Sequence, residues 1–288
     1  MDVILLTAIQ IVDSVANLAL VGFGLAVIFG MMRVINLAHG EFIMLGGFAA
    51  VFATNAGVNI WLAMLVVAPL AVGLVGLLVE RLIIRRLYGR MIDTMLATWG
   101  LSLLLIGLAT SLFGNRVMGI AAPLASFDIG GYSVSIYDQV IVAVCILVYA
   151  AGYLILRLTR WGLIARATMQ NAEMAASLGI ARSTVFATTF TIGAALSGLA
   201  GGLIAPLSGV VPTMGAAYVA KAFITVITGG TDVIAGTAVS ASVLGAISTW
   251  ATFLTTPVIG DVAMLAAAII FLRLLPRGVS GGFRGGSS

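Results

Sequence analysis

Long apolar runs, one after another, are the feature of this sequence that most constrains its fold. Several of them, such as residues 60–82 and 136–156, approach or exceed the ~20 residues that a helix needs to cross a bilayer. Barrel strands would instead be about ten residues long, with alternating polarity. The composition agrees, because only 8% of the residues are charged, against about a quarter in soluble domains. The sequence therefore predicts a helical integral membrane protein.

The predicted fold class is all-α: a polytopic membrane protein with about 8–10 transmembrane or re-entrant helices, two of them broken. We expect a single transmembrane domain over residues 1–276 and a flexible, glycine-rich tail over residues 277–288. Uninterrupted spans are expected at residues 15–32, 60–82, 94–113, 136–156, 184–206 and 261–274.

Two elements are interrupted by glycine. One covers residues 34–54 and the other residues 218–253. Broken hydrophobic segments in both halves of a chain indicate a transport pathway, because irregular backbone is tolerated in a membrane where it lines a cavity. The alternative is that the glycines only kink these helices for packing. The interrupting glycines are Gly40, Gly46 and Gly47 in the first element and Gly229 and Gly230 in the second.

Small residues also predict how one span packs. Residues 184–206 contain several that let helix backbones approach closely in a membrane. A tight helix interface is therefore expected along Gly193, Ser197, Gly198, Gly201 and Gly202.

The basic residues predict the orientation. Thirteen of the fourteen are arginines, and loops rich in arginine stay in the cytoplasm. Residues 114–135 are then outside, and residues 218–253 must form a hairpin or a re-entrant pair. The same count places the amino terminus outside. The arginines that define the inside are Arg81, Arg85, Arg86 and Arg90, then Arg157, Arg160, Arg166 and Arg182, then Arg273, Arg277 and Arg284.

Polar residues within apolar sequence are candidates for the functional site, because burying them in a membrane is costly unless they are paired. Asn36 and His39 lie three apart and would share a helical face. Glu41 would join them only if the chain breaks at Gly40. Such donors and acceptors suit a small polar solute. An internal hydrogen-bond network is the alternative.

Two further stripes of polar residues are candidates for lining a pathway. Hydroxyls in membrane helices also bond the preceding turn of their own helix, and a lysine near a membrane surface can snorkel, so structural roles are the alternatives. The stripes are Thr94, Thr98 and Ser102 with Trp99 beside them, and Tyr218, Lys221, Thr225 and Thr228.

Residues 161–180 are less apolar than anything before them and are expected outside the bilayer core. Glu173, two small residues and Gly179 predict a short helix with a glycine stop, a shape that could dock into a partner's groove. A solvated loop is the alternative.

The chain has no phosphate-binding loop signature and no metal-ligand spacing, so we expect neither an enzyme nor a metal site.

The sequence resembles, over nearly its whole length, the membrane permeases of bacterial ABC importers of the branched-chain amino acid type. The motifs that carry the resemblance are GMMRVINLAHGEFIMLGG, ERLIIRRLYGR, RATMQNAEMAASLGI, FTIGAALSGLAGGL, AFITVITGG and LLPRGVSGG. Within this family, the sequence resembles the urea and short-chain amide permeases more than the leucine-isoleucine-valine members. The segments that carry this resemblance are LYGRMIDTMLATWGLSLLL, MAASLGI, and VVPTMGAAY with GDVAMLAAAIIFLRLLPRG. Two departures are Arg33, where the family has glycine, and TDVIAG, in place of a glycine-rich turn.

The resemblance implies a multi-pass subunit of the bacterial inner (cytoplasmic) membrane that forms the pathway for urea or a related small amide. Alternatives are a permease for branched-chain or other amino acids, a passive urea or amide channel, and a secondary transporter that uses Glu41 as its ion-coupling carboxylate. Residues 161–180 would then couple to an ATPase through Arg166, Asn171, Glu173, Ala175, Ala176 and Gly179.

The implied partners are a second homologous permease, two cytoplasmic ATPase subunits and a periplasmic solute-binding protein, all around a membrane-embedded core in contact with lipid. ATP and Mg²⁺ would be held by the ATPase subunits, so no cofactor is expected in this chain. No nucleic acid is expected as a partner.

Overall fold

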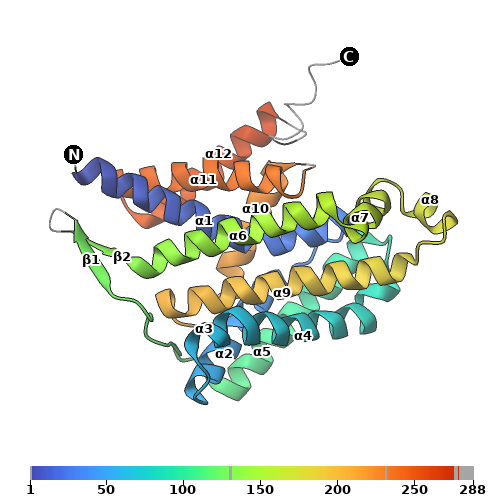
Figure 1. Cartoon of the computed structure of the whole chain (residues 1–288), viewed down its shortest axis with the longest axis horizontal. Helices are drawn as coiled ribbons and strands as arrows, with labels where there is room; N and C mark the ends of the chain where they lie inside the picture. The colour runs from blue at the N-terminus through green and yellow to red at the C-terminus, as the bar shows by residue number, and fades with distance from the viewer. Residues whose placement is uncertain (1, 130–131, 231, 276–277, 279–288) are drawn as a thin grey trace. The chain divides into compact units, whose positions relative to one another are not determined.

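The computed structural model describes residues 2–129, 132–230, 232–275 and 278, and nearly all their regular structure is helical (Figure 1). Seven helices in this part of the chain are long and apolar enough to span a membrane. The predicted fold class, an all-α polytopic membrane protein, is therefore confirmed. The spanning helices are α1 (Asp2–Met32), the continuous helix α3 (Ile60–Leu62), η1 (Ala63–Val67) and α4 (Ala68–Leu82), α5 (Met91–Phe113), α6 (Ile136–Leu158), α9 (Arg182–Ser208), α11 (Ala235–Leu254) and α12 (Pro257–Leu274).

Shorter elements connect these helices. Two helices, α2 (His39–Asn55) and α10 (Gly215–Gly229), have 17 and 15 residues. The connection between α6 and α9 is helical and consists of α7 (Arg160–Gln170) and α8 (Ala172–Ser177). The 3₁₀ turn η2 (Ile84–Leu87) follows α4, and a hairpin of β1 (Ser126–Ile129) and β2 (Tyr132–Ser135) precedes α6.

The chain forms two compact units. The first comprises Met1–Gly22, Ala122–Ala150 and Lys221–Ser288, and the second comprises Phe23–Ala121 and Ala151–Ala220. A single domain over residues 1–276 stays a prediction. The predicted flexible tail falls, apart from Gly278, outside the described residues.

The second unit is packed around α9, which lies against α2 and α4 (Figure 1). Small residues on α9 permit this close packing. A Cβ at Gly201 would overlap the carbonyl oxygen of Ile43 in α2, and a Cβ at Gly198 would lie 2.7 Å from the Cβ of Val72 in α4. The tight interface predicted along this helix is confirmed.

In the first unit, α1 meets α11 at Gly22, where a Cβ would lie 3.3 Å from the methyl carbon of Thr237. The helices α11 and α12 pack against each other. A salt bridge joins α10 to α12, because the Nζ atom of Lys221 lies 2.9 Å from Oδ1 of Asp261. The unit therefore combines close helix contacts with one charged link between helices.

The first interruption of the helices differs from the prediction. The backbone leaves the helical conformation over residues 33–38, whereas α2 runs without a break through Gly40, Gly46 and Gly47. These glycines serve close approach instead, since a Cβ at Gly40 would overlap the carbonyl group of Gly215. The predicted break at Gly40 was therefore wrong, since α2 is continuous at this residue. Glycine is needed there because the backbone of Gly215 occupies the space that a side chain would take.

The second interruption lies where it was predicted. The helix α10 ends at Gly229, and Gly230 has a φ of +85°, a conformation that glycine adopts without steric cost. Asp232 then caps the next helix, because its Oδ1 accepts hydrogen bonds from the backbone N–H groups of Ile234, at 3.2 Å, and Ala235, at 3.1 Å. Asp232 thus supplies a helix cap at the place where a glycine-rich turn was expected.

Candidate transport site

The non-helical segment 33–38 in the second unit is held by α5. Thr98 provides the link, because its Oγ1 accepts a hydrogen bond from the backbone N–H of Leu37 at 3.1 Å and lies 3.2 Å from the carbonyl oxygen of Ile35. Asn36 shapes the same segment locally, since its Oδ1 accepts from the N–H of Ala38 at 3.1 Å. The segment therefore has a defined conformation that leads directly into α2.

His39 is the first residue of α2 and is fully buried. Its Nδ1 lies 3.1 Å from the hydroxyl oxygen of Ser197 in α9. That hydroxyl donates its one hydrogen to the carbonyl of Gly193 at 2.9 Å, so it accepts from His39, which assigns a proton to Nδ1. The ring therefore ties α2 to α9 through a directed hydrogen bond.

Glu41 lies in the first turn of α2 and is also buried. The hydroxyl of Ser102 in α5 hydrogen-bonds to its carboxylate. Its Oε2 atom, like the Nδ2 atom of Asn36, has no hydrogen-bond partner among the described residues. Buried polar atoms are normally paired, so these two atoms are the unsatisfied donor and acceptor at the start of α2.

The three polar residues are thus brought into one buried region, but not as the sequence predicted. Asn36 precedes the helix and does not share a helical face with His39. His39 contacts α9, while Glu41 contacts α5 and lies beside Gly215, where a Cβ would be 2.8 Å from its Oε1. Each residue therefore meets a different neighbour.

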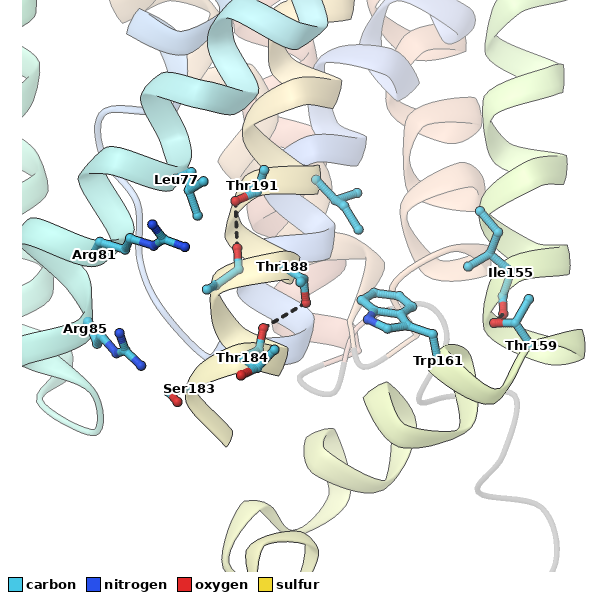
Figure 2. Close-up of a pocket in the computed structure, with 12 residues that line it drawn as sticks. Leu77, Arg81, Arg85, Ile155, Thr159, Trp161, Ser183, Thr184, Thr188 and Thr191 are labelled. Atoms are coloured by element: carbon cyan, nitrogen blue, oxygen red, sulfur yellow. Dashed lines mark hydrogen bonds between the residues drawn. The ribbon is translucent and has the colours of Figure 1, made fainter. Parts of the chain in front are cut away.

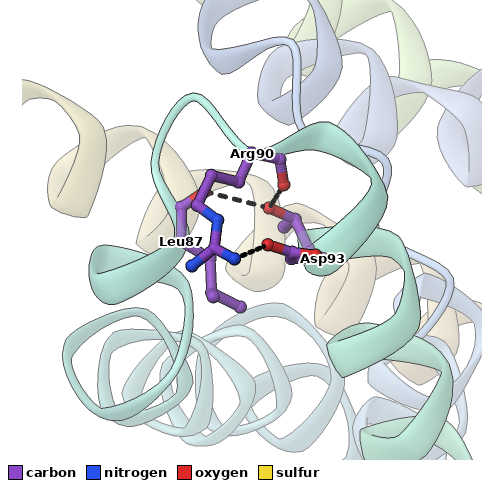
Figure 3. Close-up of polar contacts among 4 residues, drawn as sticks. Leu87, Arg90 and Asp93 are labelled. Carbon is purple, nitrogen blue, oxygen red and sulfur yellow. Dashed lines mark hydrogen bonds and ion pairs between the residues drawn. The ribbon is translucent and has the colours of Figure 1, made fainter.

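The hydroxyl stripe of α5 is buried, whereas Trp99 is 55% exposed on another face of that helix. Thr94 bonds the carbonyl oxygens of Leu87 and Arg90 at 3.2 and 2.7 Å, beside the salt bridge that joins Arg90 to Asp93 (Figure 3). These bonds close the turn that starts α5. Thr94 therefore serves the local structure in this conformation, and Trp99 faces away from the buried stripe.

The candidate residues of α10 are more dispersed. Tyr218 and Lys221 are half-buried, and Lys221 pairs with Asp261. Thr225 is buried and donates to the carbonyl oxygen of Lys221 at 2.8 Å. One turn further on, the buried hydroxyl of Thr228 has no partner within the described chain.

The segment predicted to couple to an ATPase contains two helices, so a plain solvated loop is excluded. Arg166 is half-buried in α7. Asn171 caps α8, because its Oδ1 accepts from the N–H groups of Glu173 and Met174 at 3.1 and 2.9 Å. These bonds satisfy donors that the first turn of a helix leaves open.

The end of α8 is closed by a Schellman motif. Gly179 has a φ of +86°, its N–H bonds the carbonyl of Ala176, and the N–H of Ile180 bonds the carbonyl of Ala175. The predicted short helix with a glycine stop is therefore present. Its outer surface is apolar in part, with Met174 60% and Leu178 77% exposed.

A polar cluster between α4 and α9 was not predicted from the sequence. Glu80 is fully buried and its Oε1 accepts a hydrogen bond from the hydroxyl of Tyr88. Arg182, the first residue of α9, stacks its guanidinium group 4.9 Å from the ring centre of Phe186. Burial and the bond to Glu80 raise the pKa of Tyr88 well above its usual range, so the hydroxyl remains a donor. In the sequence, Glu80 at the end of an apolar run was the signal that could have indicated this cluster.

Ser197 was identified only as a small residue, although it is the partner of His39. A serine in a membrane helix can serve close packing or hydrogen bonding, so the sequence alone does not show that Ser197 bonds to His39. Among the described residues, no group of three or more His, Cys, Asp or Glu side chains could hold a metal ion.

Comparison with known proteins adds the family. A family model for the permease component of branched-chain amino acid transport systems matches residues 7–274. The high-affinity branched-chain amino acid transport system permease protein LivH of Escherichia coli (strain K12) is 28% identical over 279 residues, which cover 91% of each chain. BraD of Pseudomonas aeruginosa, of the same description, is 28% identical over 286 residues, again 91% of each chain.

More distant relatives agree. The probable branched-chain amino acid transport permease protein LivH of Methanocaldococcus jannaschii is 25% identical and covers 92% of this chain and 88% of its own. A chain of PsaBC from Streptococcus pneumoniae, solved in complex with Fab, superposes with a TM-score of 0.53 over 93% of this chain and 91% of that one, at 13% identity. That likeness supports the fold alone.

The matched range takes in both helix interruptions, the buried start of α2 and the exposed α8. The chain is a multi-pass membrane protein that belongs to the family of permease components of branched-chain amino acid transport systems.

Proposed function

We propose that this chain is the permease subunit of an ATP-driven importer of the ABC type that carries branched-chain amino acids. The observation that carries the proposal is the family match over residues 7–274. Relatives from two bacteria and an archaeon are described as permeases for branched-chain amino acids. This supports the amino acid alternative over urea or a short amide, which the sequence motifs had favoured.

The unsatisfied polar atoms at the start of α2 fit the chemistry of an amino acid. Asn36 Nδ2 is a donor and Glu41 Oε2 is an acceptor, and both are buried. A zwitterion offers a carboxylate to the donor and an ammonium group to the acceptor. Urea could bond to the same two atoms through its carbonyl oxygen and its N–H groups, but it is neutral and would bring no positive charge to the carboxylate. We expect the solute to meet these two groups when the pathway opens.

The exposed α8 is the proposed contact with a partner ATPase. Its caps at Asn171 and Gly179 hold it in shape, and Met174 and Leu178 offer apolar surface. A movement of this helix would reach α9, which follows it directly and packs on α2 and α4. ATP binding to the partner would thereby alter the packing around the start of α2, in an alternating-access mechanism.

The assembly we propose lies in the bacterial inner membrane. It contains a second homologous permease, two cytoplasmic ATPases that bind ATP and Mg²⁺, and a periplasmic binding protein that delivers the solute. This chain itself performs no bond chemistry, and no cofactor is assigned to it.

The substrate is tested by uptake of labelled leucine into proteoliposomes that contain the assembled complex, the binding protein and ATP. Excess isoleucine and valine should compete with leucine, whereas urea and acetamide should not. Saturable, ATP-dependent uptake of urea would contradict the substrate assignment. Flux through the purified chain alone would indicate a channel, and dependence on an ion gradient would indicate a secondary transporter.

Coupling is tested on α8. We expect Glu173→Ala to lower ATP-dependent uptake and the recovery of ATPase with the purified permease. Ser177→Ala is the matched control, because that side chain is exposed on the same helix and bonds only the carbonyl of Glu173. Uptake at the wild-type rate in the Glu173→Ala complex would remove α8 from the coupling mechanism.

The pathway is tested at the start of α2. Asn36→Leu, His39→Leu and Glu41→Gln should each lower uptake, by about tenfold where a bond to the solute is lost, while the complex still assembles. Ser197→Ala controls for the structural role of His39, because it removes the hydrogen bond between this hydroxyl and the histidine and leaves the ring in place. Normal uptake in a variant would make that residue structural only.

A further inference from the structure

A cavity of about 710 Å³ opens in the second unit among α4, η2, α7, α9 and the end of α6. Figure 2 shows Arg81 and Arg85 reaching into it from one side and Trp161 from the other, with α9 between them. The cavity belongs to none of the functions proposed above. It lies in the part of the chain whose arginines predict a cytoplasmic position.

The charged wall of the cavity has no counter-charge. Arg81 and Arg85 are exposed, and the salt bridges formed within the described chain involve other residues. No acidic residue lines the cavity. The Ser183 hydroxyl and the Trp161 indole N–H are also unused as donors among the described residues. The site therefore presents two cations and two neutral donors to a ligand.

Apolar side chains also line the cavity, away from the arginines along the helix axes, and the hydroxyls of Thr159, Thr188 and Thr191 in the wall already donate to carbonyl oxygens one turn back. Leu77 precedes Arg81 by four residues, which is about one helical turn or ~6 Å. On α9, Ile192 follows Ser183 by nine residues, or about 13 Å along the axis. Leu77 and Ile192 line the same cavity as the arginines. A ligand that is anionic at one end and apolar at the other would match both the arginines and the apolar side chains.

We propose that this cavity binds an anionic phospholipid of the cytoplasmic leaflet. The phosphate lies between Arg81 and Arg85, Ser183 and Trp161 donate to the headgroup, and the start of an acyl chain lies against Leu77 and Ile192. Arginines on the cytoplasmic side of membrane helices attract anionic lipid, and tryptophan favours the level of the headgroups. A free phosphate ion would leave the apolar wall unused.

The test compares binding of phosphatidylglycerol with that of phosphatidylcholine with the same acyl chains, measured by native mass spectrometry on the full chain in detergent. The wild type should prefer phosphatidylglycerol, and Arg81→Gln/Arg85→Gln should lose about tenfold or more of that affinity. The matched control is Arg86→Gln/Arg160→Gln, since both arginines are exposed in the same cytoplasmic segments and neither lines the cavity. The control should bind phosphatidylglycerol like the wild type.

A second variant guards against misfolding of the first. Ser183→Asp places a negative charge in the cavity at the start of α9, where an acidic residue favours the helix. It should lower phosphatidylglycerol binding and leave phosphatidylcholine binding unchanged.

Four results would overturn the proposal. An equal loss in the control pair would indicate general attraction to basic loops, and equal binding of both lipids would indicate an apolar groove. Full competition by glycerol 3-phosphate would indicate a site for small anions. Loss of lipid binding by the wild type once partner ATPases are bound would indicate a protein-docking surface.

Discussion

Arg33 directly follows α1 and has a backbone conformation that suits glycine, because its φ is +53°. A non-glycine residue in the left-handed region costs ~1–2 kcal/mol. We therefore expect Arg33→Gly to raise the thermal midpoint of the purified protein, by an amount that corresponds to about 1 kcal/mol. Arg33→Ala removes the same charge but keeps a Cβ, so it should bring no such gain. Equal midpoints for the two variants would contradict the explanation by backbone strain.

At the scale of elements, the packing of α9 against α2 depends on Gly201. An added methyl group would overlap the carbonyl oxygen of Ile43, so Gly201→Ala should destabilise the protein by roughly 1–3 kcal/mol. Gly107→Ala on α5 is the control, because a Cβ there meets nothing within 4 Å and alanine favours helix by up to ~1 kcal/mol. Thermal midpoints should move in opposite directions. A tolerated Gly201→Ala would mean that the two helices separate easily.

The bond between Glu80 of α4 and Tyr88, which directly follows η2, is also an element-scale contact. Tyr88→Phe leaves the buried Glu80 carboxylate without its donor, which should cost ~1–3 kcal/mol. Replacing both partners by apolar residues, as Glu80→Leu/Tyr88→Phe, should restore part of that loss, because no buried charge is then left unpaired. Chemical or thermal unfolding of the three variants measures the difference. A double variant less stable than Tyr88→Phe would show that the carboxylate has another partner.

At the scale of the whole molecule, the distribution of arginines predicts which loops face the cytoplasm. Cys145 is the only cysteine and is buried, so single cysteines can be introduced into a Cys145→Ala background. We expect Ser126→Cys, in the exposed β hairpin, to react with an impermeant maleimide on intact cells. Ser177→Cys, at the end of α8, should react only after permeabilisation. The reverse pattern would invert the topology and remove α8 from contact with a cytoplasmic ATPase.

The sequence by itself determined the fold class, the positions of the spanning helices apart from the start of α1, the break after Gly229 and the short α8 with its glycine stop. The helix α1 begins at Asp2 and not near residue 15 as predicted. Each correct prediction rests on a local rule: the length of an apolar run, glycine where φ is positive, or a cap at a helix end. Such rules need no knowledge of neighbours in space.

Only the tertiary structure decided what Gly40, His39 and Trp99 do. A glycine in an apolar run serves either a turn or a close approach, and the backbone of Gly215 decides for close approach at Gly40. The partner of His39 lies 158 residues away on α9, and the face that exposes Trp99 depends on which helices cover α5. The cavity beside Arg81 likewise exists because residues 77–85, 155–161 and 183–192 converge there. Contacts between distant segments follow from the packing of helices, which the pattern along one helix does not specify.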